Sequence, residues 1–379
     1  MPDYPARPGG PLVWAHGGSV PQQRALAAIL ARMAQTRPEL TLLLSGPEPT
    51  APAPLLHTEL PPESIPATQH FATHWAPDLV LWAGQALRPA LLDAVSRGSA
   101  NLVLVAAEDL PWTSDAMRWV PDTETGVLAL FDRIFTTDAA AARRLRRMGL
   151  YSSSITTSGP LTETAPPLDC AQALHEEMAG VLAGRPVWLA SRVRPGEVET
   201  VLRAHRRASR LAHRLLLILV PADRADAEVT WREAQASGLR LCAWENGDMP
   251  DENTQVLVAE GPDDLGLWYR LAPLAFMGGS LVSGFGGHDP FEAAALGAAT
   301  LYGPNVGRHL AAYSALAEAG AARIVKDADT LSAAVSHLIA PDRAAGMAHA
   351  GWDIVTAGAA MTDMVIKHAF ALLDEKGKG

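Results

Sequence analysis

Residues 276–292 read FMGGSLVSGFGGHDPFE and indicate the fold class of the chain. An apolar strand ends at Met277, a glycine-rich loop follows, and a helix begins near Pro290. Closely spaced glycines let backbone N–H groups approach a ligand, and a helix start adds unpaired N–H groups and a partial positive charge. Strand, glycine loop and helix in this order predict an α/β sheet with a phosphate or nucleotide site at the loop.

The same order of short apolar runs and helical stretches repeats along the rest of the chain. Strands separated by helices of ~10–15 residues predict parallel sheets built from βαβ units. The proline-rich stretch 161–169 interrupts the series, which then restarts. We therefore predict two Rossmann-like domains over residues 1–160 and 170–379, with 161–169 as the linker. Ligands of such sheets bind beyond the carboxyl ends of the strands.

The composition excludes several classes of function. The chain has 379 residues, of which 48% are hydrophobic and 19% charged, as in a globular protein with sizeable cores. Its formal net charge of −10 argues against general nucleic-acid binding. Two cysteines, Cys170 and Cys242, are too few for a disulfide scaffold or a cysteine-based zinc site. The histidines are scattered without the spacing of metal ligands, so we predict no metal.

The sequence predicts neither a signal peptide nor a membrane-spanning helix. Its longest uncharged stretch, 271–287, is broken by Pro273 and several glycines. Two helical stretches carry arginines, namely Arg143, Arg144, Arg146 and Arg147 in one and Arg203, Arg206, Arg207, Arg210 and Arg214 in the other. Solvated helix faces and contact with anionic lipid headgroups or phosphates both explain these arginines.

Glu292 is the first candidate for a specific contact. A glutamate early in a helix can accept hydrogen bonds from both hydroxyls of a ribose. A simpler interpretation is an ordinary capped helix, in which Asp289 is the N-cap, Pro290 holds the first position and Glu292 complements the dipole. The residues alone leave both interpretations open.

These motifs, with several others along the chain, resemble those of bacterial 3-deoxy-D-manno-octulosonic acid (Kdo) transferases. The matching segments are Trp14-Ala15-His16, Ser19-Val20, Pro77-Asp78-Leu79-Val80-Leu81-Trp82, Ser158-Gly159, Ser191, Pro195-Gly196-Glu197, Gly278 to Val282, Gly286 to Glu292, and Gly303-Pro304. The resemblance implies a GT-B fold, in which two Rossmann-like domains with parallel sheets face each other across a cleft. It implies transfer of Kdo from CMP-Kdo to a lipid A precursor, as in lipopolysaccharide biosynthesis.

The resemblance also assigns the two sides of the site. On the N-terminal, acceptor side it places a loop with Ser19 and Gln22. The C-terminal domain would bind the donor nucleotide sugar through Ser191, Gly278, Gly279, Ser280, Gly286, Gly287, His288, Asp289 and Glu292. Arg192 and Arg194 join these candidates by their position after the first strand of that domain. The CMP-sugar is a substrate, and no cofactor or metal is implied. The implied partners are this donor and a glycolipid or glycan acceptor. The implied location is the cytoplasm, peripheral on the cytoplasmic face of the inner membrane.

The chain departs from the family at charged positions. The glutamate proposed as general base in the family is Gln22 here, and an amide cannot take a proton from a hydroxyl. The cation-bearing Pro-Arg-His segment becomes Pro221-Ala222-Asp223, and the asparagine before the helix becomes Asp289. Arg192 and Arg194 are candidates to replace the lost cation.

Three residues are candidates to replace the base: Glu108, Asp109 and His16. Solvated loop charges and a structural histidine are the simpler interpretations of the same residues. The first functional hypothesis is a glycosyltransferase of Kdo-transferase type. The alternatives are a non-catalytic relative that binds nucleotide or glycan, and a transferase with a different donor and acceptor. A sugar-nucleotide epimerase of the same architecture explains fewer of the motifs.

Overall fold

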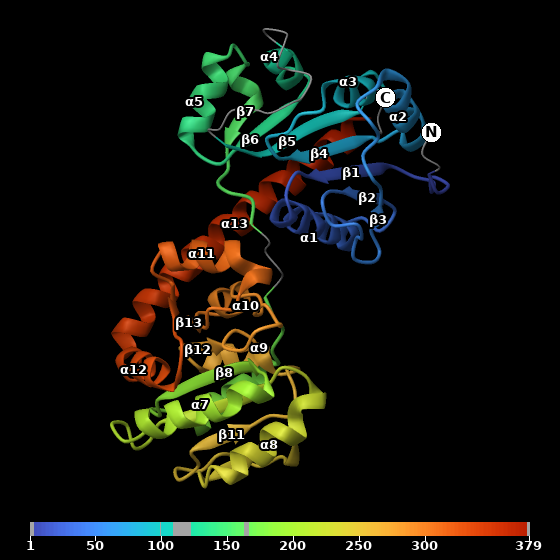
Figure 1. Ribbon diagram of the computed structural model, residues 1–379. Coiled ribbons are helices and arrows are strands. Elements are labelled where there is room, and N and C mark those ends of the chain that lie inside the picture. The colour runs from blue at the N-terminus through green and yellow to red at the C-terminus, as the bar shows by residue number, and fades with distance from the viewer. Residues whose placement is uncertain (1–3, 99, 109–122, 163–166, 377–379) are drawn as a thin grey trace. The chain divides into compact units, whose positions relative to one another are not determined.

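The computed structural model describes residues 4–98, 100–108, 123–162 and 167–376 (Figure 1). The chain divides into two compact units. Unit 1 comprises Met1–Thr164 together with Ala357–Gly379, and unit 2 comprises Ala165–Thr356. The division falls inside the stretch 161–169 that the sequence marks as a linker. Among the described residues, no helix is long and apolar enough to cross a membrane.

The described part of unit 1 forms a seven-stranded parallel sheet in the order β3-β2-β1-β4-β5-β6-β7. Its strands are β1 (Leu12–Gly17), β2 (Thr41–Ser45), β3 (Leu56–His57), β4 (Leu79–Ala83), β5 (Asn101–Ala107), β6 (Arg133–Thr136) and β7 (Ile155–Thr157). Its own helices are α1 (Val20–Thr36), α2 (Ile65–Trp75), α3 (Pro89–Arg97), α4 (Thr123–Leu128) and α5 (Ala139–Arg147), with the 3-10 turn η2 (Ser152–Ser154).

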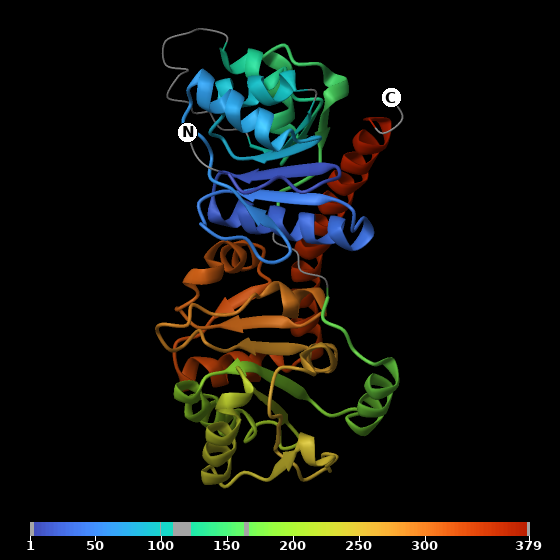
Figure 2. The same ribbon diagram turned by 90° about the vertical axis from the view of Figure 1, so that its right-hand side faces the viewer.

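Helices cover both faces of this sheet (Figure 2). Alternate residues of β1 point to opposite faces, as a period of two requires. Val13 and Ala15 pack with α1, whereas Leu12 and Trp14 pack with α2 and α3. Because both faces are buried, the strands read as near-continuous apolar runs in the sequence. The direction of strand order reverses between β1 and β4, which creates a switch point at their carboxyl ends.

The described part of unit 2 repeats this plan with the order β10-β11-β9-β8-β12-β13-β14. Its strands, also parallel, are β8 (Val187–Val193), β9 (Leu216–Pro221), β10 (Leu241–Ala243), β11 (Val256–Val258), β12 (Leu274–Met277), β13 (Ala299–Tyr302) and β14 (Ala322–Ile324). Its helices are α6 (Gln172–Val181), α7 (Pro195–Ala208), α8 (Ala227–Ala236), α9 (Leu265–Leu271), α10 (Phe291–Ala295), α11 (Leu310–Glu318) and α12 (Ala328–Leu338), with the 3-10 turns η3 (Arg224–Asp226), η4 (Trp244–Asn246) and η5 (Gly307–His309).

The last helix, α13 (Pro341–Lys376), corrects the predicted extent of the second domain. Residues 357–379 belong to unit 1 and not to a domain running from 170 to 379. The reason is apolar burial, because Met361, Val365, Ala369 and Leu373 pack in the core cluster of α1 and the unit 1 sheet. Burial of a methionine, valine or leucine side chain contributes about 1.5–3 kcal/mol, so Met361, Val365 and Leu373 hold the helix to unit 1.

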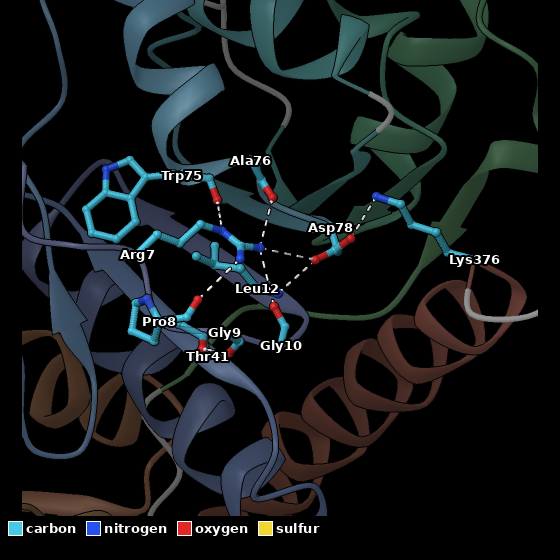
Figure 3. A network of polar contacts seen from close by, with 10 residues as sticks. All are labelled: Arg7, Pro8, Gly9, Gly10, Leu12, Thr41, Trp75, Ala76, Asp78 and Lys376. Atoms are coloured by element: carbon cyan, nitrogen blue, oxygen red, sulfur yellow. Dashed lines mark hydrogen bonds and ion pairs between the residues drawn. The ribbon is translucent and has the colours of Figure 1, made fainter.

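Polar contacts hold the end of α13 to the same unit (Figure 3). Lys376 Nζ lies 2.9 Å from Asp78 Oδ1, and the Leu12 N–H donates to Asp78 Oδ2 at 2.9 Å. Arg7 lies beside this pair and donates through Nε to the Trp75 carbonyl oxygen at 2.6 Å. The Lys376 and Asp78 side chains are partly exposed, so their ion pair adds roughly 1 kcal/mol or less to the apolar contacts.

The predicted fold class is confirmed for each unit. Each described sheet is parallel, has helices on both faces and is Rossmann-like. The carboxyl ends of β8 and β12, the neighbouring strands at the switch point of unit 2, carry the loops that the sequence singles out. The carboxyl ends of β1, β4 and β5 carry the corresponding loops of unit 1.

Candidate functional site

The switch point of unit 2 joins the two loops predicted to hold the donor. The Gly278 N–H, after β12, donates to the Ser191 carbonyl oxygen of β8 at 2.7 Å. A Cβ atom at Gly278 would collide with the backbone of Arg192, so only glycine permits this approach. The segment of Arg192 and Arg194 therefore lies against the start of the glycine loop.

Glu197 occupies the backbone groups that the sequence suggests for a phosphate. This residue lies in the first turn of α7 and is fully buried. Its Oε2 accepts from the Gly279 N–H at 2.6 Å, and its Oε1 accepts from the Ser280 and Leu281 N–H groups at 3.0 and 2.7 Å. The expectation that the Gly279 and Ser280 amides face a ligand is therefore corrected, because both donate to Glu197.

The two predicted serines are also engaged internally. Ser191 is fully buried, and its Oγ lies 2.6 Å from the hydroxyl of buried Tyr269. Burial raises the pKa of Tyr269, so this phenol stays protonated. Ser280 is fully buried and accepts from the Gly303 N–H at 2.8 Å. Ser191 and Ser280 thus support the loop from inside, which corrects their expected role as direct donor contacts.

Arg192 is held in an unusual backbone conformation at the same edge. Its φ is 52°, in the left-handed region, at a bulge of β8 between Ala190 and Val193. Its Nη2 donates to both carboxylate oxygens of Glu292 at 3.1 Å. Its Nε is buried and has no hydrogen-bond partner among the described residues. A strained non-glycine residue with an unused donor is more typical of functional sites than of ordinary loops.

Arg194 lies one position beyond β8 and is enclosed by acids and an aromatic ring. Its Nη1 lies 2.7 Å from Asp223 Oδ2 and 3.0 Å from Asp226 Oδ2. The Phe285 ring, in the glycine loop, lies 4.7 Å from the Arg194 guanidinium carbon in a cation–π contact. This guanidinium also lowers the pKa of the Asp223 carboxyl. Asp223 is therefore an ion-pair partner of Arg194.

His288 adds a neutral imidazole to this group. Burial, and then the charges of Arg192 and Arg194, lower its pKa to about 4. Its Nε2 is buried with no hydrogen-bond partner in the described residues. A Cβ atom on Gly279 would lie 3.3 Å from this Nε2, and Gly279 has a φ of 66°. A side chain at Gly279 would therefore press on the imidazole.

The helix after the glycine loop begins one residue later than the sequence predicts. α10 has five residues, with Pro290 at its N-cap position. The Asp289 Oδ1 accepts from the Phe291 N–H at 2.9 Å, so Asp289 ends the loop by a local turn. Gly286 takes part in a shallow groove of about 480 Å³, lined by residues 284–286 and 304–308. Gly287 is buried, and its N–H donates to the Gly279 carbonyl oxygen at 3.0 Å.

The candidates of unit 1 lie at the carboxyl edge of its own sheet. Ser19 caps α1 by accepting from the Gln22 N–H at 3.4 Å. A Cβ atom on Gly84, after β4, would lie 3.3 Å from Gln22 Oε1, so this amide covers the switch point. Glu108 directly follows β5 and is partly exposed. Asp109 lies outside the described residues.

His16 ends up in the sheet and not on its edge loop. It is 7% exposed, its Nδ1 lies 3.0 Å from Ser45 Oγ, and its ring packs on Trp82 at a centroid distance of 4.1 Å. Burial, and then the charge of Arg88, lower its pKa to about 3. An imidazole with so low a pKa is a weak base, which favours the structural interpretation of His16.

The comparisons with known proteins agree with the resemblance seen in the sequence. Residues 2–162 match the family model of 3-deoxy-D-manno-octulosonic-acid transferase (kdotransferase). The match covers less than half of the chain, which is similar to Kdo transferases in this region. It is 26% identical over 320 residues to the "Probable 3-deoxy-D-manno-octulosonic acid transferase, mitochondrial" of Arabidopsis thaliana, covering 79% of this chain and 70% of that protein. It is 30% identical over 173 residues to the 3-deoxy-D-manno-octulosonic acid transferase of Haemophilus influenzae, covering 45% and 40%.

Solved structures match at lower similarity. The C-terminal CMP-Kdo binding domain of WaaA from Acinetobacter baumannii matches with a TM-score of 0.40 and 22% identity, covering 54% of this chain and 99% of that one. A complex of S. aureus MnaA with UDP matches with a TM-score of 0.45 and 16% identity, covering 96% and 98%. Each unit by itself is Rossmann-like, and two Rossmann-like domains are the components of a GT-B fold.

Sequence reasoning missed two parts of this site. Asp226, in η3, and Phe285 both contact Arg194, and Glu197 holds the glycine loop. Phe285 lies in the loop already singled out, and an aromatic residue between Gly284 and Gly286 was the available signal. The contact between Glu197 and Gly279 spans 82 residues, and no local spacing reveals it.

Proposed function

We propose that the chain is a glycosyltransferase of Kdo-transferase type whose donor is a CMP-activated acidic sugar bound at the glycine loop of unit 2. The observation that carries this proposal is the group formed by Arg192, Arg194, His288 and Glu292 at the carboxyl ends of β8 and β12. Three nitrogens of this group are buried without a hydrogen-bond partner in the described residues. Phosphate oxygens would accept hydrogen bonds from such nitrogens. The similarity to Kdo transferases supports the proposal that the sugar substrate is CMP-activated.

The proposed reaction needs no metal. An acceptor hydroxyl loses its proton to a base and attacks the anomeric carbon, while the bond from that carbon to the phosphate oxygen breaks and CMP departs. The guanidinium groups of Arg192 and Arg194 would stabilise the charge that develops on the leaving phosphate. Glu108 directly follows β5 at the acceptor-side edge, and we propose it as the base in place of the amide of Gln22.

The acceptor in this proposal is a lipid A precursor or a related glycolipid, met at the cytoplasmic face of the inner membrane. Arg143, Arg146 and Arg147, the exposed arginines of α5, support peripheral contact with an anionic membrane. Tyr151, four residues beyond α5, is 83% exposed. Basic side chains beside an exposed tyrosine suit a negatively charged lipid surface, where each arginine adds about 1 kcal/mol.

Calorimetric titration tests the donor assignment. CMP, UDP and GDP, each free and as sugar conjugates, are titrated into the wild-type chain and into Glu292→Ala. We expect the wild type to bind CMP and the variant to bind it weakly or not at all, because the carboxylate that accepts hydrogen bonds from the ribose is removed. Binding of none of these nucleotides to the wild type would rule out the donor site.

A non-catalytic relative that binds nucleotide or glycan is the second candidate. It is favoured by Gln22 at the position of the family's proposed base and by the acids that pair with Arg192 and Arg194. Donor binding without donor consumption, over a panel of glycolipid acceptors, would support this candidate. A transferase with another donor would instead bind UDP or GDP in preference to CMP.

A further inference from the structure

The pair formed by Arg192 and Glu292 has the marks of an exchangeable contact. A strong arginine–carboxylate pair uses two nitrogens in parallel. Here one nitrogen, Nη2, serves both oxygens at 3.1 Å, while Nε is buried without a partner in the described residues. The two side chains are 21% and 18% exposed, so the pair is shielded yet reachable. The guanidinium therefore makes a weaker contact than its geometry allows.

The backbone supports the same conclusion. Arg192 keeps a φ of 52°, which L residues rarely adopt, at the bulge of β8. The local backbone does not require an arginine at this position, since glycine or asparagine adopts a positive φ more readily. The carbonyl oxygen of Arg192 also lies against Gly278, which fixes the bulge firmly. This backbone conformation thus places a guanidinium at the start of the glycine loop.

The other arginine of the loop differs from Arg192. Arg194 donates to two carboxylates at 2.7 and 3.0 Å and packs under Phe285, so three groups hold it. Arg192 has Glu292 as its single ion-pair partner among the described residues. An incoming anion therefore meets less competition at Arg192.

We propose that Arg192 and Glu292 form a self-paired latch that a nucleotide opens. The guanidinium leaves the carboxylate for the phosphate, and the freed carboxylate accepts hydrogen bonds from the ribose hydroxyls. This inference rests on the proposed function, since it concerns the same loop. It assigns Arg192 as the phosphate-binding residue, and it makes Glu292 inhibitory toward phosphate alone but required for the nucleoside.

The latch predicts opposite effects on two halves of the ligand. Inorganic phosphate, cytidine and CMP are titrated by calorimetry into wild type, Glu292→Gln, Arg192→Gln and the double variant. Glu292→Gln should bind phosphate roughly tenfold more tightly and cytidine roughly tenfold more weakly than wild type, because one charge-assisted hydrogen bond corresponds to about this factor. Arg192→Gln should weaken phosphate and CMP roughly tenfold and leave cytidine binding unchanged or tighter.

The controls separate a latch from a structural ion pair. Glu48→Gln breaks a partly exposed ion pair with Arg24 in unit 1 and should change none of the three affinities. Glu292→Ser replaces Glu292→Gln if the latter loses its native circular dichroism. Loss of both phosphate and cytidine binding in Glu292→Gln would mean a purely structural role and would overturn the inference.

The titration with inorganic phosphate also distinguishes failure of this inference from failure of the proposed function. If wild type binds CMP but Glu292→Gln gains no affinity for phosphate, the latch is wrong and the donor site stands. If wild type binds no nucleotide, the donor assignment fails. The latch then fails as well, because it requires a nucleotide that opens the pair.

Discussion

Replacing Glu197 by alanine perturbs the best-defined feature of the candidate site. Its carboxylate accepts from the N–H groups of Gly279, Ser280, Leu281 and Arg194 at 2.6, 3.0, 2.7 and 3.0 Å, and the residue is fully buried. At about 1.5 kcal/mol for each hydrogen bond to a charged group, the four interactions amount to about 6 kcal/mol. Backbone relaxation and entering water recover part of this loss. We expect the free energy of unfolding of unit 2 to fall by about 4 kcal/mol.

Hydrogen exchange followed by mass spectrometry measures this effect locally. Peptides from β8, β12 and the glycine loop should lose protection in Glu197→Ala, while peptides from the sheet of unit 1 keep it. Glu199→Ala is the matched control, because Glu199 is exposed on the same helix and its removal should cost within about 0.5 kcal/mol. If Glu197→Ala and Glu199→Ala differ by less than about 1 kcal/mol, the loop is held by something other than this carboxylate.

Three further predictions concern pH, catalysis and membranes. The pKa values of His16 and His205 are lowered to about 3 and about 4, chiefly by burial, so the unfolded chain binds protons that the folded chain does not. The contribution of these two histidines to the free energy of unfolding should therefore be fully present above pH 6.5. Below it, the free energy of unfolding should fall by about 1.4 kcal/mol per pH unit for each histidine as the pH drops toward 4. Urea unfolding at pH 7 and pH 5 measures this, and equal stability at the two pH values would contradict it. Glu108→Gln should slow donor consumption by about a hundredfold or more in a nucleotide-release assay, whereas an unchanged rate would remove Glu108 as the base. Changing the three exposed arginines of α5 to glutamate should weaken binding to anionic vesicles by about a hundredfold or more, as measured by cosedimentation at low salt. Binding to neutral vesicles should not change. If the variant binds anionic vesicles as well as the wild type does, this face does not contact the membrane.

The fold follows from the sequence because its determinants are local. Each strand is a short apolar run followed by a helical stretch, and the parallel order of β8 and β12 follows from βαβ connections. The assignment of 357–379 to the second domain failed for a different reason. An apolar stripe predicts burial but does not say against which sheet, and the stripe from Met361 to Leu373 meets the sheet of unit 1.

The sequence predicted where the candidate site lies better than it predicted what each of its residues does. The sequence places the glycine loop, Arg192 and Glu292 at one edge, and the structure brings them together. It does not reveal that the loop amides are taken by Glu197, because a glutamate in the first turn of a helix looks like an ordinary contribution to the helix dipole. The sequence also does not show whether a serine hydroxyl such as that of Ser191 is buried or faces a ligand, since its burial depends on Tyr269 of the neighbouring helix α9.

Donor consumption is the measurement that tests the central claim most directly. The wild-type chain is incubated with CMP-Kdo and a lipid A precursor in anionic vesicles, and released CMP is quantified against a control without acceptor. We predict acceptor-dependent release of CMP that Arg192→Gln reduces by about tenfold or more. Release that never exceeds the control, from a chain shown by calorimetry to bind CMP, would contradict the transferase and leave a nucleotide-binding relative.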